Sequence, residues 1–241
     1  VFAIAIGTAA LPSFSRHVAT GKMDELKSGI AFSLRLMLFL TIPATVALMA
    51  LNLPIISVLF QRGAFDVQAA VYTGQALFCY ALGLCAFSVL RVFVSSFYSL
   101  QDSKWPLKAA VITLIVNLLA SLILMYSLKH NGIALASSIS AIVNVLVLAY
   151  VLKTKIGVYL DRAFYASVSR IVLSALLMLG AIGLVEYIMP WNTHAAFQIR
   201  LIYLSVAIFC GASVFLVCAY LLKIPEMHAM TNILKKRLGR S

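Results

Sequence analysis

The chain has 241 residues, of which 63% are hydrophobic and only 11% are charged, with a formal net charge of +12. Soluble domains contain about 45–50% apolar and about 25% charged residues, so this composition indicates a membrane protein. The basic residues cluster in the gaps between apolar runs and form no polar face interleaved with aromatics, which argues against a nucleic-acid partner and favours a membrane topology signal.

The apolar residues fall into runs of about 20, long enough to cross a hydrocarbon core about 30 Å thick. The opening stretch, residues 1–11, is apolar with no basic segment before it, so we expect the end of a helix that begins earlier. Single long runs without two-residue alternation predict helices and not barrel strands. We therefore expect an all-α polytopic membrane protein with the end of one helix and then six full transmembrane helices, at residues 29–52, 67–100, 105–128, 132–153, 165–189 and 198–223.

The basic residues between the runs are unevenly divided if successive loops alternate sides. One side holds only three of them, Arg62, Lys129 and Arg200. Because positively charged loops stay in the cytoplasm, the richer side and the C-terminus are predicted to be cytoplasmic. The thirteen basic residues of that side are Arg16, Lys22, Lys27, Lys104, Lys108, Lys153, Lys155, Arg162, Lys223, Lys235, Lys236, Arg237 and Arg240.

Polar residues recur at helical spacing within four consecutive runs. Such stripes have two interpretations: their side chains form hydrogen bonds between helices, or they line a water-filled cavity. Stripes on four successive helices, one of them bearing an arginine, favour a shared polar cavity. The residues expected to line it are Arg35, Ser88, Arg91, Ser95, Ser99, Asn117, Ser137 and Asn144.

Arg91 is the deepest charge, about ten residues or about 15 Å inside the predicted cytoplasmic boundary. A charge at such depth costs about 2.5–3.5 kcal/mol on insertion scales unless it meets water or an anion. No acidic residue precedes Asp102 in its stripe, so we predict a cavity that binds an anionic group, with a purely structural arginine as the alternative. Arg35 lies nearer the boundary, where snorkelling of its side chain is a sufficient explanation.

Other reactive groups are sparse in the sequence. Glu186, the one carboxylate inside an apolar run, is expected at the outer interface in the neighbourhood of Arg200. The cysteines lie within apolar runs, form no CxxC pair and have no histidine nearby, so they are predicted to be buried small apolar residues. We expect no metal site, no redox chemistry and no cofactor. The four cysteines are Cys79, Cys85, Cys210 and Cys218.

Four short segments occur in order along the chain: TAALPSFS at 8–15, LFQRGAFD at 59–66, FYSLQDSKWPLK at 97–108 and GIALASS at 132–138. Together they resemble the MurJ/MviN lipid II flippase family of the multidrug/oligosaccharidyl-lipid/polysaccharide exporter superfamily, over essentially the whole chain. Members of that family have two six-helix lobes followed by two extra helices. The resemblance implies a second lobe, incomplete at its N-terminus, at 1–155, two additional transmembrane helices at 156–224, and a basic cytoplasmic tail at 225–241.

The resemblance implies a transporter and not an enzyme, multi-pass in the bacterial cytoplasmic (inner) membrane. Its expected activity is to move undecaprenyl-pyrophosphate-linked peptidoglycan precursor (lipid II) from the cytoplasmic to the outer leaflet by alternating access. The expected partners are this precursor, membrane lipids and the N-terminal lobe of the same protein. The alternatives are a flippase for another lipid-linked oligosaccharide or a drug exporter of the same superfamily; the two extra helices favour the lipid II type.

The resemblance also bears on individual residues. Arg91 matches a position where basic residues are usual, and the extra helix pair forms a groove associated with the lipid tail in the family. Some members bind sodium, and Asn117 matches one ligand position. Ser121 stands where a carboxylate is expected one turn later, so the metal prediction remains none.

Overall fold

The computed structural model describes residues 2–227. Within that range the chain forms helices joined by short connections, and six of the helices are long and apolar enough to cross a membrane. These six are α2 and α4 to α8, and they match the six predicted runs, which confirms an all-α polytopic fold. The helices are α1 (Phe2–Ala19), α2 (Met23–Ala50), α3 (Asn52–Phe60), α4 (Val67–Ser99), α5 (Lys104–Leu128), α6 (His130–Ile156), α7 (Arg162–Ile188) and α8 (Phe197–Leu221).

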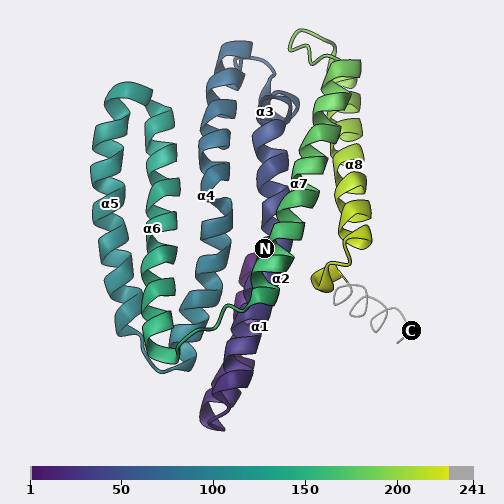
Figure 1. Cartoon of the computed structure of the whole chain (residues 1–241). Coiled ribbons are helices and arrows are strands. Elements are labelled where there is room, and N and C mark those ends of the chain that lie inside the picture. Colours follow the sequence, from purple (N-terminus) through teal and green to yellow (C-terminus); the bar gives the residue numbers. More distant parts are fainter. Residues whose placement is uncertain (1, 228–241) are drawn as a thin grey trace.

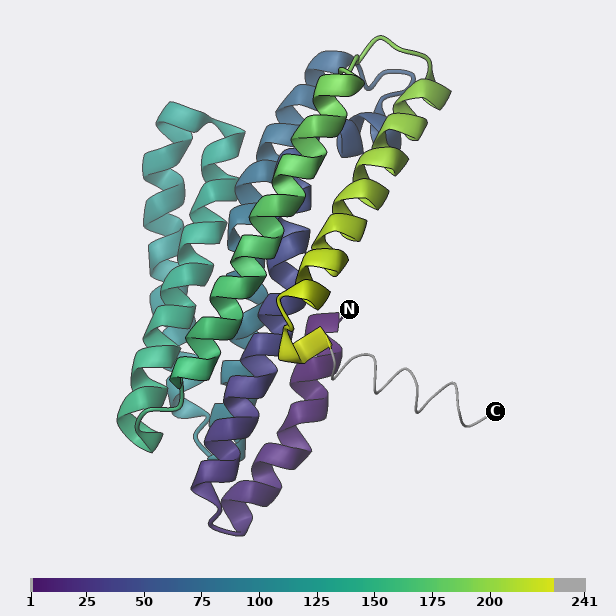
Figure 2. The same ribbon diagram turned by 45° about the vertical axis from the view of Figure 1, so that its right-hand side comes forward.

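The helices stand roughly side by side, and their connections alternate between the two ends of the molecule (Figure 1). The α1–α2, α4–α5 and α6–α7 connections lie at one end, which we call the inner end. The α3–α4, α5–α6 and α7–α8 connections lie at the other, the outer end. Neighbouring helices pack in the order α5, α6, α4, α2, α7, α8, with α1 against both α4 and α2. The last two helices run together along one edge (Figure 2).

Two long helices begin at an acidic residue that caps their exposed N–H groups. Asp66 accepts a hydrogen bond from the backbone N–H of Ala69 at 2.8 Å, and Asp161 accepts one from Phe164, also at 2.8 Å. Such caps satisfy donors that lack a partner within the helix, and their negative charge suits the positive end of the helix dipole. These caps fix where α4 and α7 start.

The predicted run at 29–52 is longer and more broken than expected. Its helix starts at Met23, stays helical through Pro43 and ends at Ala50, after which the chain resumes as the short helix α3. Pro54 falls in the first turn of α3, where its missing N–H sacrifices no intrahelical bond. The sequence analysis did not predict α3. This helix packs against both α4 and α8.

Two hydrophobic clusters divide the interior. The first joins α1, α2, α4 and the inner half of α6 around fully buried residues such as Leu26 and Phe97. The second joins α2 and α3 to α7 and α8 around Ile171 and Ala207. Helix α2 contributes to both clusters, so it connects the α1–α6 part of the chain to the α7–α8 pair.

Helices α4 and α6 approach so closely that only glycine fits at one position. A Cβ atom on Gly83 would lie 2.7 Å from Ser138 Oγ and 2.8 Å from Ser138 Cα. The Ser138 hydroxyl uses this proximity to donate to the carbonyl of Cys79 at 2.6 Å. Small residues commonly allow such contacts between helices in membranes.

The predicted basic tail begins inside the described part of the chain but mostly lies beyond it. Residues 222–223 form a turn after α8, and residues 225–227 are helical. The four basic residues assigned to the tail lie outside the described residues: Lys235, Lys236, Arg237 and Arg240.

Candidate functional site

Arg91 projects from the inner third of α4 (Val67–Ser99) into a cavity shared with α1. Ser95, one turn further along, donates a hydrogen bond to the carbonyl of Gly7 at 2.9 Å and so fixes α1 against α4. Gly7 permits this approach, because a Cβ atom there would lie 3.1 Å from Arg91 Cβ. The cavity has a volume of about 250 Å³ and is lined by Gly7, Thr8, Leu11, Arg91, Val94, Ser95 and Tyr98.

Arg91 keeps its positive charge available within this cavity. Its side chain is exposed, and no carboxylate in residues 2–227 forms an ion pair with it. The walls beside it are largely apolar side chains of α1 and α4. An arginine in such surroundings can hold an anionic group by charge-assisted hydrogen bonds.

A second cavity, of about 340 Å³, lies on the other side of α4, between α4, α5 and α6. Val94 and Tyr98 line both cavities, so the two adjoin across one stretch of α4. Asn144 reaches the second cavity from α6, and its side-chain oxygen Oδ1 is shielded from solvent with no hydrogen-bond donor beside it in the described part of the chain. The structure therefore places Arg91, Ser95 and Asn144 around two neighbouring hollows.

The other serines of the α4 stripe lie elsewhere. Ser88 is 5% exposed and Ser99 is 4% exposed, so both face the interior of the helix bundle. Ser99 donates to the carbonyl of Ser96 in its own helix at 2.8 Å. The four residues of the stripe follow helical spacing, but of these four Arg91 and Ser95 alone line the α1–α4 cavity.

Asn117 and Ser137 join α5 to α6. The Asn117 amide donates to the hydroxyls of Ser140, at 3.1 Å, and Ser137, at 3.5 Å. Both serines in turn donate to carbonyls within α6. This arrangement is the interhelical hydrogen bonding that was the alternative interpretation of the polar stripes. No group of three or more metal-binding side chains occurs in the described residues.

Arg35 lies at the inner end, apart from both cavities. Its Nε atom is 2.8 Å from an oxygen of Glu226, a carboxylate with no exposed surface. The second oxygen of Glu226 accepts a hydrogen bond from Ser167 of α7 at 2.7 Å. We call Arg35, Ser167 and Glu226 the inner cluster; it joins α2, α7 and the helical residues 225–227 that follow α8.

A related group of residues occupies the outer end. Arg200 of α8 donates to Ser57 at 3.0 Å and to Gln61 at 2.6 Å, and Gln61 also donates to the carbonyl of Thr193 at 3.1 Å. We call Arg200, Ser57 and Gln61 the outer cluster. Glu186 is exposed and forms no ion pair with Arg200 within the described residues. Sequence analysis missed Glu226, Ser57 and Gln61, because their partners are distant along the chain.

An apolar cavity of about 280 Å³ lies between α2, α7 and α8. Its lining comes from all three helices and carries almost no polar surface. The residues that line it include Pro43, Ala47, Met178, Ile182, Ala212 and Phe215.

Comparisons with known proteins agree with the sequence resemblance. A family model described as lipid II flippase MurJ matches residues 1–202. A probable lipid II flippase MurJ of Rhizobium meliloti (strain 1021) is 34% identical over 182 residues, covering 76% of this chain and 34% of the relative. One of Rickettsia prowazekii (strain Madrid E) is 31% identical over 234 residues, covering 96% of this chain and 46% of the relative. The chain thus spans less than half the length of these curated relatives.

A solved structure shows the same fold. It is described as lipid II flippase MurJ in an inward closed conformation, and it superposes with a TM-score of 0.73 at 26% sequence identity. The match covers 92% of this chain and 43% of that protein. The arrangement of the helices is therefore that of part of a known membrane protein.

Proposed function

This chain belongs to the lipid II flippase MurJ family, and we propose that it acts within a flippase that moves lipid-linked peptidoglycan precursor from the cytoplasmic to the outer leaflet. In this proposal, residues 1–155 are the second lobe of a two-lobe transporter and 156–224 are two additional transmembrane helices. Residues 225–241 are a basic cytoplasmic tail. An alternating-access cavity lies at the interface between structural repeats, so the other lobe of the same protein is the required partner.

The observation that carries this proposal is Arg91, which forms no ion pair with the described residues, in the cavity between α1 and α4. An undecaprenyl-linked precursor carries a pyrophosphate, and a guanidinium matches phosphate oxygens with its planar array of N–H donors. Most of the wall beside Arg91 is apolar, so the described residues around it offer no competing anion. Ser95 supports the same cavity by holding α1 in place.

The apolar cavity between α2, α7 and α8 suits the lipid part of the substrate. The cavity lining is formed by alkyl and aromatic side chains of all three helices. An isoprenoid tail has no hydrogen-bonding groups, so it gains from burial against such a surface. We propose that the additional helix pair holds part of the tail while the pyrophosphate occupies the lobe.

Arg91 can be tested in the complete protein that carries this chain, produced in cells depleted of their own flippase. Arg91→Ala is expected to abolish growth while the protein still inserts into the membrane, because removing an unpaired charge favours insertion. Arg91→Lys is expected to retain substantial function, because the positive charge persists. Growth and membrane protein level are measured together.

Ser99→Ala is the matched control, because Ser99 lies on the same stripe but bonds within its own helix. It is expected to support normal growth. Full growth with Arg91→Ala would show that Arg91 does not serve the substrate, whereas loss of the protein from the membrane would assign Arg91 a structural role.

The proposed orientation places the inner end, including the C-terminus, in the cytoplasm, on the strength of the basic loops. In a protein lacking its native cysteines, a cysteine at residue 131 or 192 is expected to react with an impermeant thiol reagent added outside intact cells. Cysteines at 22, 104 and 155 are expected to react only after the membrane is permeabilised. The reverse pattern of labelling would overturn the orientation.

A further inference from the structure

Arg200 is a buried cation that has no acidic partner among residues 2–227. It lies in the first turn of α8, beneath the connection from α7, and it is only 9% exposed. Its Nη1 atom donates to the neutral oxygens of Ser57 and Gln61. No carboxylate in residues 2–227 forms an ion pair with it. The positive charge of this side chain is therefore removed from water without a counter-charge from the described residues.

Two N–H donors near this charge lack an acceptor. The Nε atom of Arg200 and the indole Nε1 atom of Trp191 are both shielded from solvent, and neither has a hydrogen-bond partner in the described part of the chain. Guanidinium and indole groups can only donate hydrogen bonds, so neither can satisfy the other. A buried donor left without an acceptor is unfavourable, and such groups normally have one.

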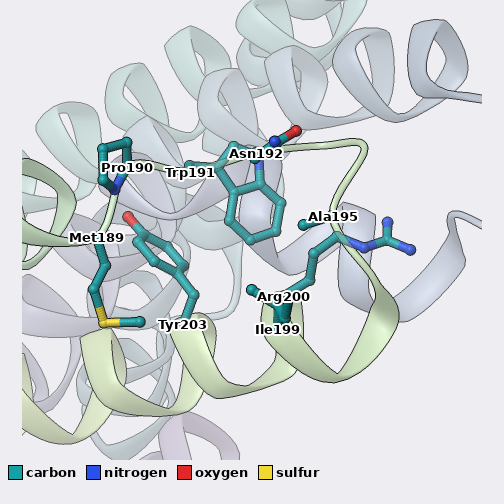
Figure 3. Close-up of a pocket in the computed structure, with 8 residues that line it drawn as sticks. All are labelled: Met189, Pro190, Trp191, Asn192, Ala195, Ile199, Arg200 and Tyr203. Atoms are coloured by element: carbon teal, nitrogen blue, oxygen red, sulfur yellow. The ribbon is translucent and has the colours of Figure 1, made fainter.

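Both side chains line the same small cavity under the α7–α8 connection. Figure 3 shows the Trp191 ring lying between Tyr203 and the stem of Arg200, with Met189 and Pro190 at one side. The rings of Trp191 and Tyr203 are 5.1 Å apart between centroids. The cavity has a volume of about 40 Å³, whereas one water needs about 10–15 Å³ on this measure. It has room for a small ion and not for a lipid headgroup.

The electrostatic surroundings of the cavity favour a negative ligand. Arg200 supplies a full charge, and the N-terminus of α8 adds the positive end of a helix dipole. Water could accept both hydrogen bonds but would leave the charge uncompensated. Glu186, near the end of α7, forms no ion pair within residues 2–227, and its charge reaches Tyr203 of this cavity. Because Glu186 is exposed to solvent, its charge is screened more strongly than that of buried Arg200.

From these observations we propose that this cavity binds a small monovalent anion of chloride size, held by Trp191 Nε1 and Arg200 Nε. The anion neutralises the buried guanidinium and fixes the α7–α8 connection over the end of α3. The site lies at the outer end, remote from Arg91 in the inner third of α4, and it does not depend on the proposed transport activity. Its expected consequence is that halide stabilises the outer end of the molecule.

Bromide quenching of tryptophan fluorescence can test the site directly. The complete protein that carries this chain is purified with every tryptophan except Trp191 replaced by phenylalanine (Trp105→Phe in this chain). Sodium bromide then replaces sodium gluconate at constant ionic strength. A bound bromide is expected to quench Trp191 saturably, and chloride is expected to relieve that quenching. Arg200→Gln is expected to weaken bromide binding at least about tenfold, the effect of losing a charge-assisted hydrogen bond.

Arg62→Gln is the matched control, because Arg62 also lies at the outer end but is exposed and donates only to the carbonyl of Leu59. It is expected to leave the saturable quenching unchanged. A strictly linear quenching curve, or equal quenching in Arg200→Gln, would overturn the proposal and leave a water-filled or empty cavity.

A second measurement covers the case in which Arg200→Gln does not fold. The melting temperature of the protein with its native tryptophans is expected to rise with chloride, and Trp191→Phe, which keeps the charge but removes the indole donor, is expected to lose most of that rise. Phosphate and vesicles containing phosphatidylglycerol are expected to give no comparable protection in gluconate. Protection by either would identify a phosphate group as the ligand and contradict the halide-sized site.

Discussion

The inner and outer clusters both attach the α7–α8 pair to the rest of the helix bundle, but they use different interactions. Each fixes the α7–α8 pair to α2 or α3 through one arginine. At the inner end Arg35 pairs with Glu226 at 2.8 Å. At the outer end the partners of Arg200 among the described residues are the neutral Ser57 and Gln61. The inner arginine thus carries its own counter-charge within the fold, and the outer one depends on neutral dipoles and, in our proposal, on a bound anion.

This difference implies unequal costs when a partner is removed. Breaking a buried ion pair leaves an uncompensated charge and costs about 3–5 kcal/mol. Removing a neutral acceptor from a charged group costs about 1.5–3 kcal/mol. The inner cluster is therefore expected to be the more sensitive of the two to single substitutions.

The largest effect is expected for Glu226→Ala. Arg35, whose side chain is 18% exposed, would keep only the exposed Asp161, at 4.0 Å, as an acidic neighbour. The protein is therefore expected to lose about 3 kcal/mol of stability, the lower end of the cost of breaking a buried ion pair. Reversible unfolding in mild detergent, followed by circular dichroism against denaturant, measures the change.

The double variant Arg35→Met with Glu226→Leu serves as its control. Replacing both charges by apolar side chains of similar size commonly restores stability or improves it. The double variant is expected to be clearly more stable than Glu226→Ala. If Glu226→Ala alone were as stable as the parent protein, Glu226 would not be compensating a buried charge.

A smaller effect is expected for Gln61→Leu in the outer cluster. The substitution removes one acceptor from Arg200 and the donor to Thr193, while Ser57 continues to accept from the guanidinium. The expected loss of stability is about 2 kcal/mol in the same unfolding experiment. A loss equal to that of Glu226→Ala would show that neutral and charged partners are equivalent at these two sites, contrary to the comparison.

The smallest effect is expected for an ion pair that remains in contact with water. Lys155 and Asp102 approach to 2.6 Å, closer than the inner pair, but 38% of the lysine side chain is exposed. Exposed pairs contribute about 0–1 kcal/mol, so Asp102→Asn is expected to cost less than about 1 kcal/mol. Asn retains an oxygen that can accept from the N–H groups of Lys104 and Trp105, as Asp102 does.

The Asp102 pair also has a defined pH dependence. The hydrogen bond from Lys155 holds the pKa of the Asp102 carboxyl below its usual range. A carboxyl whose pKa is lowered by folding stabilises the protein above its usual pKa of about 4, and that contribution disappears as the pH falls through the lowered value. The difference in stability between parent and Asp102→Asn is expected to be constant near neutral pH, to decline as the pH falls below about 4, and to vanish once the pH is below the lowered pKa. A difference that grows on acidification would contradict this assignment.

Sequence reasoning predicted the membrane-spanning helices because hydrophobic length is a local property. The runs, their boundaries within several residues, and the alternation of connections all agree with the structure. The break at Leu51 and the short helix α3 were not predicted, because residues 53–60 are too few for a transmembrane run and their helix is stabilised by packing on α4 and α8.

The candidate site was harder to predict than the fold. Helical spacing places Ser88, Arg91, Ser95 and Ser99 along one stripe, but spacing does not reveal which part of the stripe a neighbouring helix covers. Packing buries Ser88 and Ser99 and leaves Arg91 beside the α1–α4 cavity. Glu226 was included in a basic tail, since nothing local in the sequence indicates a partner as distant as Arg35.

The close contact of Gly83 with Ser138 determines where the α5–α6 hairpin lies relative to α4. Helix α5 packs mainly on α6 and barely touches α4, so the position of the whole hairpin is set by how closely α6 lies against α4. A single methyl group at residue 83 would meet the backbone of α6 and push it outward near the outer half of the bundle. Because α5 rests mainly on α6, the two helices of the hairpin would be displaced together from α4.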